Sequence, residues 1–170
     1  NILITGGSGF IGCHVLKQLM QLNHNIALLT RSRDIINDRL TVIKGDLNSI
    51  SVIIQRIIDF QPDIVIHLAW QDIPDFSKII CQGNLNMAIN FFDQVLDNTN
   101  CQKVIVSGSC FEYGKKHGNC KESDQVNITS YFTWAKYALY LYLSIKCAEK
   151  DVILNWFRIF YVYGPGQREG

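Results

Sequence analysis

The sequence has almost no excess of charge of either sign. Its 170 residues include 16 Lys and Arg against 15 Asp and Glu, which gives a net charge of +1. A chain this close to neutral has no broad electrostatic field to attract nucleic acid or an anionic membrane surface. Any anionic ligand must therefore be held by local features, and we expect neither a nucleic-acid nor a membrane partner.

Close cysteine pairs and long apolar runs are also missing. The six cysteines are scattered, without the density of a small disulfide-bonded secreted fold. No apolar run approaches the roughly 20 residues that a membrane span needs, and no basic and then apolar leader precedes the first motif. We therefore expect reduced thiols and a cytoplasmic location. We expect no metal site, because His117 and Cys120 have no second close pair to complete one.

Short runs rich in Val, Ile and Leu alternate with longer amphipathic segments. The runs lack polar alternation, as expected for parallel strands that are covered on both faces. Repeated strand–helix–strand units predict an α/β fold, a doubly wound and mostly parallel Rossmann sheet between two helical layers. The predicted strands span 2–5, 25–30, 40–45, 63–69, 103–108 and 152–159, and the predicted helices 10–22, 48–60, 78–98 and 130–149.

Two connections differ from this alternation. The crossover over residues 31–39 shows no convincing helix, and the stretch 110–129 is typical of a long surface loop, a kind of segment that often carries function. Nothing in the chain repeats, and 48% hydrophobic residues suffice for one sizeable core. One domain is the expectation.

The stretch "ITGGSGFIG" follows the first predicted strand and opens the first helix. Gly7, Gly9 and Gly12 form a Gly-x-Gly-x-x-Gly pattern there. Glycines allow a tight turn and a close approach of the backbone, and the start of a helix offers free N–H groups to a pyrophosphate. We predict a dinucleotide site made by Gly6, Gly7, Ser8, Gly9, Phe10, Ile11 and Gly12.

The same glycines also fit Thr5-Gly6-x-x-Gly9-x-x-Gly12, and here the chain resembles the extended short-chain dehydrogenase/reductase family, the NAD-dependent epimerase/dehydratases of nucleotide sugars. Further matches follow in order: "GDLN" (45–48), "HLAW" (67–70), "EYG" (112–114) and "RIFYVYGPGQ" (158–167). The resemblance implies further cofactor contacts from Asp46, Leu47, Leu68, Ala69, Trp70, Asn84, Ser107 and Lys136.

The resemblance also implies partners and a larger protein. It predicts a nucleotide-sugar substrate, a homodimer through helices 78–98 and 130–149, and a substrate-binding part beyond Gly170, with residues 1–170 as the NAD(P)-binding domain. Two of the implied cofactor contacts also have a purely structural interpretation: Asp46 could cap the helix from 48, and Asn84 could lie on a helix surface. His67 is more typical of a hydrogen-bonded core histidine than of a base.

The end of the second strand lacks the acidic residue that binds an adenosine ribose and repels a 2′-phosphate. Thr30 stands in that place, and Arg31, Ser32 and Arg33 follow it. Guanidinium groups form charge-assisted and often bidentate hydrogen bonds with phosphate. We predict NADP as the cofactor. NAD is the alternative, because the same basic residues would also suit a solvated surface turn that binds no phosphate.

The resemblance implies Ser109, Tyr131 and Lys136 as catalytic residues. In such a site a tyrosine oxygen exchanges the proton of a sugar hydroxyl while hydride moves, and the lysine favours the phenolate. In "ITSYFTWAK", however, Tyr131 is five residues before Lys136 and Phe132 is four before it. Helix positions four apart point about 40° apart, and positions five apart about 140°. The phenol is therefore displaced.

Three interpretations remain for the proton step. Tyr131 turns into the site from a loosely wound helix start, another group such as Tyr113, Glu112 or a water carries the proton, or the domain binds its cofactor without turnover. We favour an NAD(P)-dependent epimerase or ketosugar reductase, with epimerase ahead and a catalytically impaired dinucleotide-binding module as the alternative. A dehydratase is disfavoured, because Cys110 and Phe111 stand where 4,6-dehydratases carry an acidic pair.

Overall fold

Six strands form one fully parallel sheet in the order β3-β2-β1-β4-β5-β6. The computed structural model describes residues 1–31 and 39–167. The strands are β1 (Ile2–Thr5), β2 (Ile26–Thr30), β3 (Thr41–Lys44), β4 (Ile64–His67), β5 (Lys103–Ser109) and β6 (Ile153–Ile159). The helices are α1 (Phe10–Leu19), α2 (Ile50–Phe60), α3 (Lys78–Asn98) and α4 (Tyr131–Glu149), with the 3-10 turns η1 (Leu47–Ser49) and η2 (Cys110–Tyr113).

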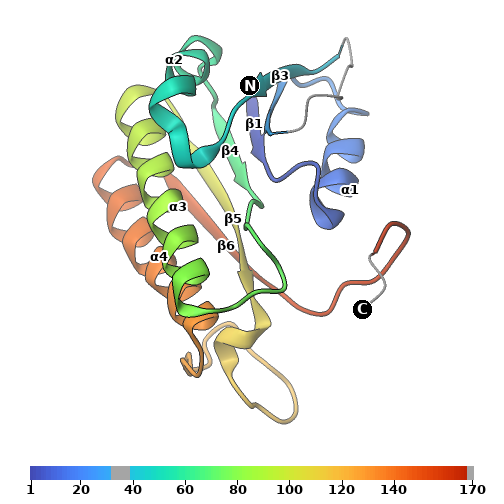
Figure 1. Cartoon of the computed structure of the whole chain (residues 1–170), viewed down its shortest axis with the longest axis vertical. Coiled ribbons are helices and arrows are strands. Elements are labelled where there is room, and N and C mark those ends of the chain that lie inside the picture. The colour runs from blue at the N-terminus through green and yellow to red at the C-terminus, as the bar shows by residue number, and fades with distance from the viewer. Residues whose placement is uncertain (32–38, 168–170) are drawn as a thin grey trace.

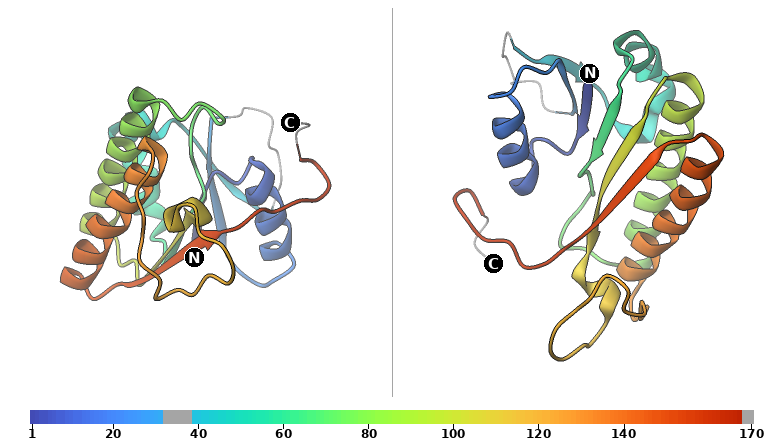
Figure 2. Two further views of the ribbon diagram at one scale, coloured as in Figure 1. Left: turned by 90° about the horizontal axis from the view of Figure 1, so that it is seen from below. Right: turned by 180° about the vertical axis from the view of Figure 1, so that it is seen from behind.

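The helices lie on both faces of the sheet. Figures 1 and 2 show α2, α3 and α4 on one face and α1 on the other. The chain adds strands outward from β1 to β3, returns across the sheet through α2, and then adds β4, β5 and β6 on the opposite side of β1. The winding direction therefore reverses between β1 and β4, which is where open α/β sheets bind their ligands.

Each face of the sheet has its own hydrophobic core. Along β1 the side chains alternate: Leu3 joins the core under α2, α3 and α4, whereas Ile2 and Ile4 join the smaller core under α1. Phe91 and Phe92 of α3 are fully buried in the larger core. Burial on both faces explains why the inner strands β1, β2 and β4 are mostly apolar, whereas the edge strands β3 and β6 are only partly buried.

Local signals explain where two of the helices begin. Ser130 caps α4, since its hydroxyl accepts from the backbone N–H of Thr133, and the Thr133 side chain accepts from the Ser130 N–H in return. In α2 the residues Ile50, Ile53 and Ile57 recur at helical spacing and are buried. Asp46 precedes α2 and caps the η1 turn that leads into it.

The structure confirms the predicted doubly wound α/β sheet, with every predicted strand and helix within a few residues of its expected bounds. The prediction for the crossover at 31–39 falls mainly on residues 32–38, which lie outside the described residues. The loop predicted for 110–129 needs one correction, because Cys110–Tyr113 form the η2 turn. A reciprocal cap between Ser109 and Glu112 stabilises it, and that cap turns the Glu112 carboxylate into the protein.

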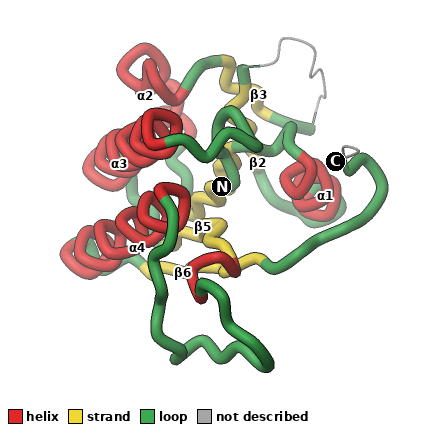
Figure 3. Tube along the Cα trace, turned by 60° about the horizontal axis from the view of Figure 1, so that its bottom comes forward, coloured by secondary structure: helices red, strands yellow, loops and turns green. Residues whose placement is uncertain are grey.

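The segment that follows β6 crosses the sheet edge toward α1. Figures 1 and 3 show it running from β6 past α1, and Nε2 of His14 lies 3.0 Å from the carbonyl oxygen of Pro165. Gly166 and Gln167 thereby reach the carboxyl-end side of the sheet. Within residues 1–31 and 39–167, none of the helices has the length and apolar composition that a membrane crossing demands.

Candidate functional site

A cleft of about 1100 Å³ opens at the carboxyl ends of β1, β2, β4 and β5. It extends from Arg31 and Asp46 on one side, over the glycine loop, to Trp70 and Ser107 on the other. The cleft therefore lies at the reversal point of the sheet. Of the predicted cofactor residues, its lining includes Gly6, Ser8, Gly9, Phe10, Ile11, Gly12, Thr30, Arg31, Asp46, Leu47, Leu68, Ala69, Trp70 and Ser107.

In the glycine loop the backbone packs too closely against other backbone atoms to leave room for a side chain. Gly6 has a φ of +73°, and a Cβ there would lie 2.5 Å from the backbone nitrogen of Ala69. A Cβ on Gly12 would lie 2.1 Å from the carbonyl oxygen of Gly6. No side chain caps the start of α1 at Gly9, so its first N–H groups can donate to an anionic ligand. The loop thus fits the pyrophosphate of a dinucleotide.

At one end of the cleft a carboxylate and a guanidinium lie close together. Nη1 of Arg31 is 4.0 Å from Oδ2 of Asp46, and both side chains are at least a third exposed. Oδ1 of Asp46 accepts from the backbone N–H of Asn48 at 2.9 Å, so Asp46 both caps the η1 turn and lines the cleft. Thr30 ends β2 and is buried. The predicted contact Ser32 lies outside the described residues.

Asn84 holds the chain that follows β4. Its Oδ1 accepts from the backbone N–H of Gln71 at 2.7 Å, and its Nδ2 donates to the carbonyl oxygens of Gln71 and Ile80. Asn84 is 4% exposed and lies behind the cleft wall. Gln71 itself lines the cleft, so Asn84 supports the site through the backbone of Gln71. The alternative that Asn84 lies on a helix surface is therefore wrong, because its side chain is buried.

Lys136 lies buried at the other end of the cleft. Its Nζ donates to the carbonyl oxygen of Ser107 at 2.8 Å and lies 4.4 Å from the centroid of the Trp70 ring. Burial lowers the pKa of Lys136 to about 8, against the opposing attraction of Glu112. The structure thus brings Lys136 and Ser107 together and adds Trp70 as the neighbour of the amine.

Tyr131 and Phe132 differ sharply in their surroundings. Tyr131 is the first residue of α4 and is 51% exposed. Phe132 packs against Trp70, Phe76 and Phe111, with ring centroids 5.1, 4.7 and 6.3 Å from its own. The side chain beside the lysine is therefore a phenyl ring inside an aromatic cluster, formed by Trp70, Phe76, Phe111 and Phe132.

A family model described as "NAD dependent epimerase/dehydratase family" matches residues 2–170. The chain belongs to this family. It is 28% identical over 134 residues to a UDP-glucose 4-epimerase of Cyamopsis tetragonoloba, an alignment that covers 67% of this chain and 37% of that protein. It is 25% identical over 193 residues to a UDP-N-acetyl-alpha-D-glucosaminuronate decarboxylase of Bacillus cytotoxicus, covering 99% of this chain and 56% of that protein.

Among solved structures, MoeE5 in complex with UDP-glucose and NAD has a TM-score of 0.81 at 28% identity. The match covers 99% of this chain and 56% of that one. The chain therefore spans 56% of the length of the decarboxylase and of MoeE5, and 37% of the length of the plant epimerase. The family match bears out the resemblance that the sequence motifs indicated.

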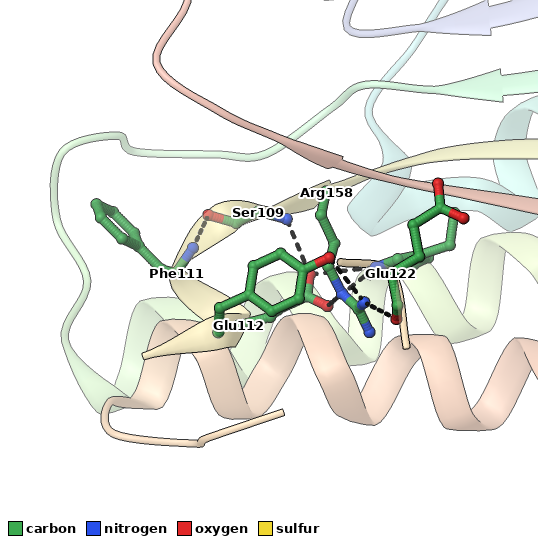
Figure 4. A network of polar contacts seen from close by, with 7 residues as sticks. Ser109, Phe111, Glu112, Glu122 and Arg158 are labelled. Atoms are coloured by element: carbon green, nitrogen blue, oxygen red, sulfur yellow. Dashed lines mark hydrogen bonds and ion pairs between the residues drawn. The ribbon is translucent and has the colours of Figure 1, made fainter. Parts of the chain in front are cut away.

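Glu112 is buried in a complete set of hydrogen bonds (Figure 4). Its carboxylate accepts from the backbone N–H of Ser109 at 2.8 Å, from Nε1 of Trp156 at 3.1 and 3.2 Å, and from Nε of Arg158 at 2.9 Å. Nη1 of Arg158 also donates to the Tyr113 hydroxyl. Both alternative proton carriers in "EYG" are thus held by a structural network, which joins η2 to β6.

Ser109 sits at the start of the same turn. Its hydroxyl accepts from the backbone N–H of Phe111 at 3.2 Å, and the residue is 9% exposed. Tyr142 and Lys146 repeat the four-residue spacing of a Tyr/Lys pair, but they bind the acidic residues Asp93 and Asp97 of α3. Burial and the Asp93 contact raise the pKa of Tyr142 to about 12, which makes it a poor proton carrier near neutral pH.

His67 is a core histidine, as predicted. Its Nδ1 shares a hydrogen bond of 2.8 Å with the hydroxyl of Thr5, and its ring packs on Phe91 and Phe92. Burial, and to a lesser degree the charge of Lys136, lowers the pKa of His67 to about 3. The ring is therefore neutral at physiological pH and supports β1 and β4 from inside.

The predicted cofactor residues and the residues that line the cleft do not coincide fully. Gly7 was predicted as a cofactor contact, but it is buried in the loop between β1 and α1 and does not line the cleft. Gly166 and Gln167 come from the far end of the chain, and only the course of the segment after β6 brings them to α1. The other lining residues that sequence reasoning missed are Cys13, Leu29, Gly45, Gln71, Asp72, Ile73 and Pro74.

Proposed function

We propose that the protein is an NAD(P)-dependent nucleotide-sugar epimerase, in which this chain holds the dinucleotide. The continuous cleft that joins the glycine loop to Ser107 carries the proposal, because it fits the length of an extended ligand with a central pyrophosphate. In this placement the adenosine half lies near Arg31 and Asp46, and the nicotinamide half lies near Trp70 and Ser107. When bound, the nicotinamide would supply hydride transfer at a sugar carbon.

The residues of this chain would position the reacting groups. The Lys136 amine beside Ser107 is the proposed contact to the nicotinamide ribose, and Ser109 supplies the hydroxyl that orients the sugar oxygen. Tyr131 remains the proposed proton carrier from the sequence motif. Because its side chain is exposed on the first turn of α4, it serves that role only if this turn unwinds.

The substrate proposal follows the related proteins. The plant relative is a UDP-glucose 4-epimerase, and MoeE5 is described in complex with UDP-glucose. The test uses the full-length protein with NAD and UDP-glucose, and measures the formation of the 4-epimer by chromatography. Formation of the 4-epimer supports the epimerase. Net oxidation of reduced cofactor by a ketosugar would support the reductase instead, and cofactor binding without either reaction would leave a dinucleotide-binding module.

For the cofactor, we keep NADP as the proposal and NAD as its alternative. Thr30 in place of an acidic residue and an exposed Arg31 at the cleft favour a 2′-phosphate. Asp46, at 4.0 Å from Arg31, weakens this preference, and MoeE5 is described with NAD. Titration calorimetry with both cofactors decides between them. Arg31→Ala should weaken NADP alone, by about tenfold, whereas the equally charged control Arg56→Ala on α2 should change neither affinity.

We also keep the predicted homodimer and cytoplasmic location as proposals. Helices α3 and α4 pack side by side (Figure 1). They carry apolar side chains that are exposed in the single chain, namely Ile79, Trp134, Leu141 and Ile145. A second copy could cover them. Sedimentation of the full-length protein measures the assembly, and Ile145→Glu should shift a dimer toward monomer.

A further inference from the structure

The Lys136 amine is shielded from the cleft that it adjoins. Lys136 is 4% exposed, and its Nζ lies 4.4 Å from the centroid of the Trp70 ring. Nζ donates to the carbonyl oxygen of Ser107, while Trp70 and Ser107 both line the cleft. Trp70 therefore contacts the buried amine and also borders the space in which a ligand would lie.

The indole N–H of Trp70 lacks a hydrogen-bond partner. Among residues 1–31 and 39–167, Trp70 Nε1 is the one buried side-chain nitrogen or oxygen atom without one. The ring packs at 82° to Phe132, whose phenyl ring carries no oxygen or nitrogen acceptor. Leaving a buried donor unpaired is costly, and such groups usually have a specific reason in native proteins. A second position of the ring that pairs this donor would remove the cost.

The backbone beside Trp70 is fixed, so a change there is a rotation of the side chain. Both backbone groups of Gln71 bond to the buried side chain of Asn84. The Trp70 ring contacts Lys136 and Phe132, and Trp70 also lines the cleft. The cleft is consequently the direction in which the indole can turn into another staggered rotamer.

We propose that the Trp70 indole has two positions, one over Lys136 and one turned into the cleft, where its N–H donates to an oxygen on the nicotinamide half of a bound dinucleotide. In the first position the π face of the ring holds the ammonium. In the second, the amine is uncovered and can reach the ligand. The proposal rests on the proposed function, because a dinucleotide must enter the cleft.

Indole N–H resonances in ¹⁵N NMR spectra of the full-length protein test the ligand contact. The indole N–H groups of the three tryptophans have different surroundings: that of Trp156 donates to Glu112, Trp134 is exposed, and that of Trp70 has no partner. The cofactor that calorimetry shows to bind, NADP or NAD, should move the Trp70 resonance downfield, as a new hydrogen bond forms, and leave the Trp156 resonance in place. AMP, which carries only the adenosine half, should leave both in place. Trp70→Phe assigns the resonance by removing it.

Acetylation of lysines tests the shield without any ligand. Acetic anhydride and mass spectrometry of the full-length protein give the rate at Lys136, with the exposed Lys44 as the internal reference. Trp70→Ala should raise the rate at Lys136 by about tenfold, the factor expected for losing an attraction of cation–π size. Trp70→Phe keeps an aromatic face and should leave it close to the unmodified value. Equal rates in the unmodified protein and Trp70→Ala would overturn the shield.

The two experiments separate this proposal from the proposed function. If calorimetry shows that neither NAD nor NADP binds, the proposed function fails, while the acetylation rates still decide whether Trp70 covers Lys136. If either cofactor binds and the Trp70 resonance stays in place, the second position of the indole is refuted and the dinucleotide site stands. Trp70→Phe should also weaken NAD binding by about tenfold through the lost donor, with AMP binding unchanged.

Discussion

The phenyl ring of Phe132 has its centroid 6.0 Å from Nζ of Lys136. The four-residue spacing on α4 puts both side chains on one face of the helix, and Tyr131 is left exposed beside them. The site therefore combines an amine of lowered pKa with a neighbour that cannot exchange a proton. We expect this pairing to limit the rate of the proposed reaction.

Phe132→Tyr should raise turnover, because a phenol would then stand beside Lys136. General acid–base groups contribute a factor of roughly a hundred or more, so we expect a gain of about a hundredfold in kcat for epimerisation. The matched control is Phe76→Tyr, which adds a hydroxyl to the same aromatic cluster without a place beside Lys136. If turnover does not rise in Phe132→Tyr and vanishes in Tyr131→Phe, the displaced tyrosine carries the proton.

Two glycine substitutions should have opposite effects. In Gly12→Ala the new Cβ would lie 2.1 Å from the carbonyl oxygen of Gly6, so the loop must shift. We expect loss of NAD binding and a drop of about 1–3 kcal/mol in the free energy of unfolding. In Gly83→Ala the new Cβ meets nothing within 4 Å inside α3, and the free energy of unfolding should rise by about 0.5–1 kcal/mol.

Calorimetry and urea denaturation measure both glycine variants. Gly83→Ala should bind NAD as the unmodified protein does, so it controls for the added methyl group. Unchanged NAD affinity in Gly12→Ala would contradict the close packing of the glycine loop on which the cofactor site depends.

The parts of this molecule that local patterns determine could be predicted from the sequence. Apolar runs locate the strands because both faces of the sheet are covered, and the glycine pattern locates the loop between β1 and α1. Burial of Glu112 was not predictable, since its partners Trp156 and Arg158 come from a strand more than 40 residues away. The contact between Trp70 and Lys136 likewise depends on the packing of two distant segments.

Glu112→Ala should destabilise the protein strongly. The substitution would leave the guanidinium of Arg158 and the indole N–H of Trp156 without their carboxylate, which costs about 3–5 kcal/mol for a buried ion pair. The exposed Glu149→Ala on α4 is the matched control and should stay within about 0.5 kcal/mol. Urea denaturation gives both values.

Glu112→Gln tests the remaining catalytic interpretation of the same residue. Its amide has one acceptor oxygen where the carboxylate has two for Ser109, Trp156 and Arg158, so we expect lower stability. Turnover per folded molecule should be retained, since the carboxylate is fully engaged with Ser109, Trp156 and Arg158. A variant of normal stability without turnover would instead make Glu112 the proton carrier.

The buried amine of Lys136 should make stability rise with pH in one window. Burial lowers its pKa in the folded protein to about 8 from an ordinary value of 10.5, so between these values the unfolded chain binds more protons. The free energy of unfolding must then increase with pH across the window, and the full difference corresponds to about 3 kcal/mol. Below pH 8 and above pH 10.5 this contribution is constant.

Lys136→Met isolates this contribution. Burial raises the pKa of Tyr142 to about 12 and that of Cys147 to about 11, and both groups make stability fall as pH rises in the same region. They are present in both proteins, so the difference between the unmodified protein and Lys136→Met removes their effect. Urea denaturation from pH 7 to pH 10.5 should show the unmodified protein gaining stability relative to the variant. A constant difference would mean that Lys136 keeps an ordinary pKa, and therefore that Trp70 and Ser107 do not bury its amine.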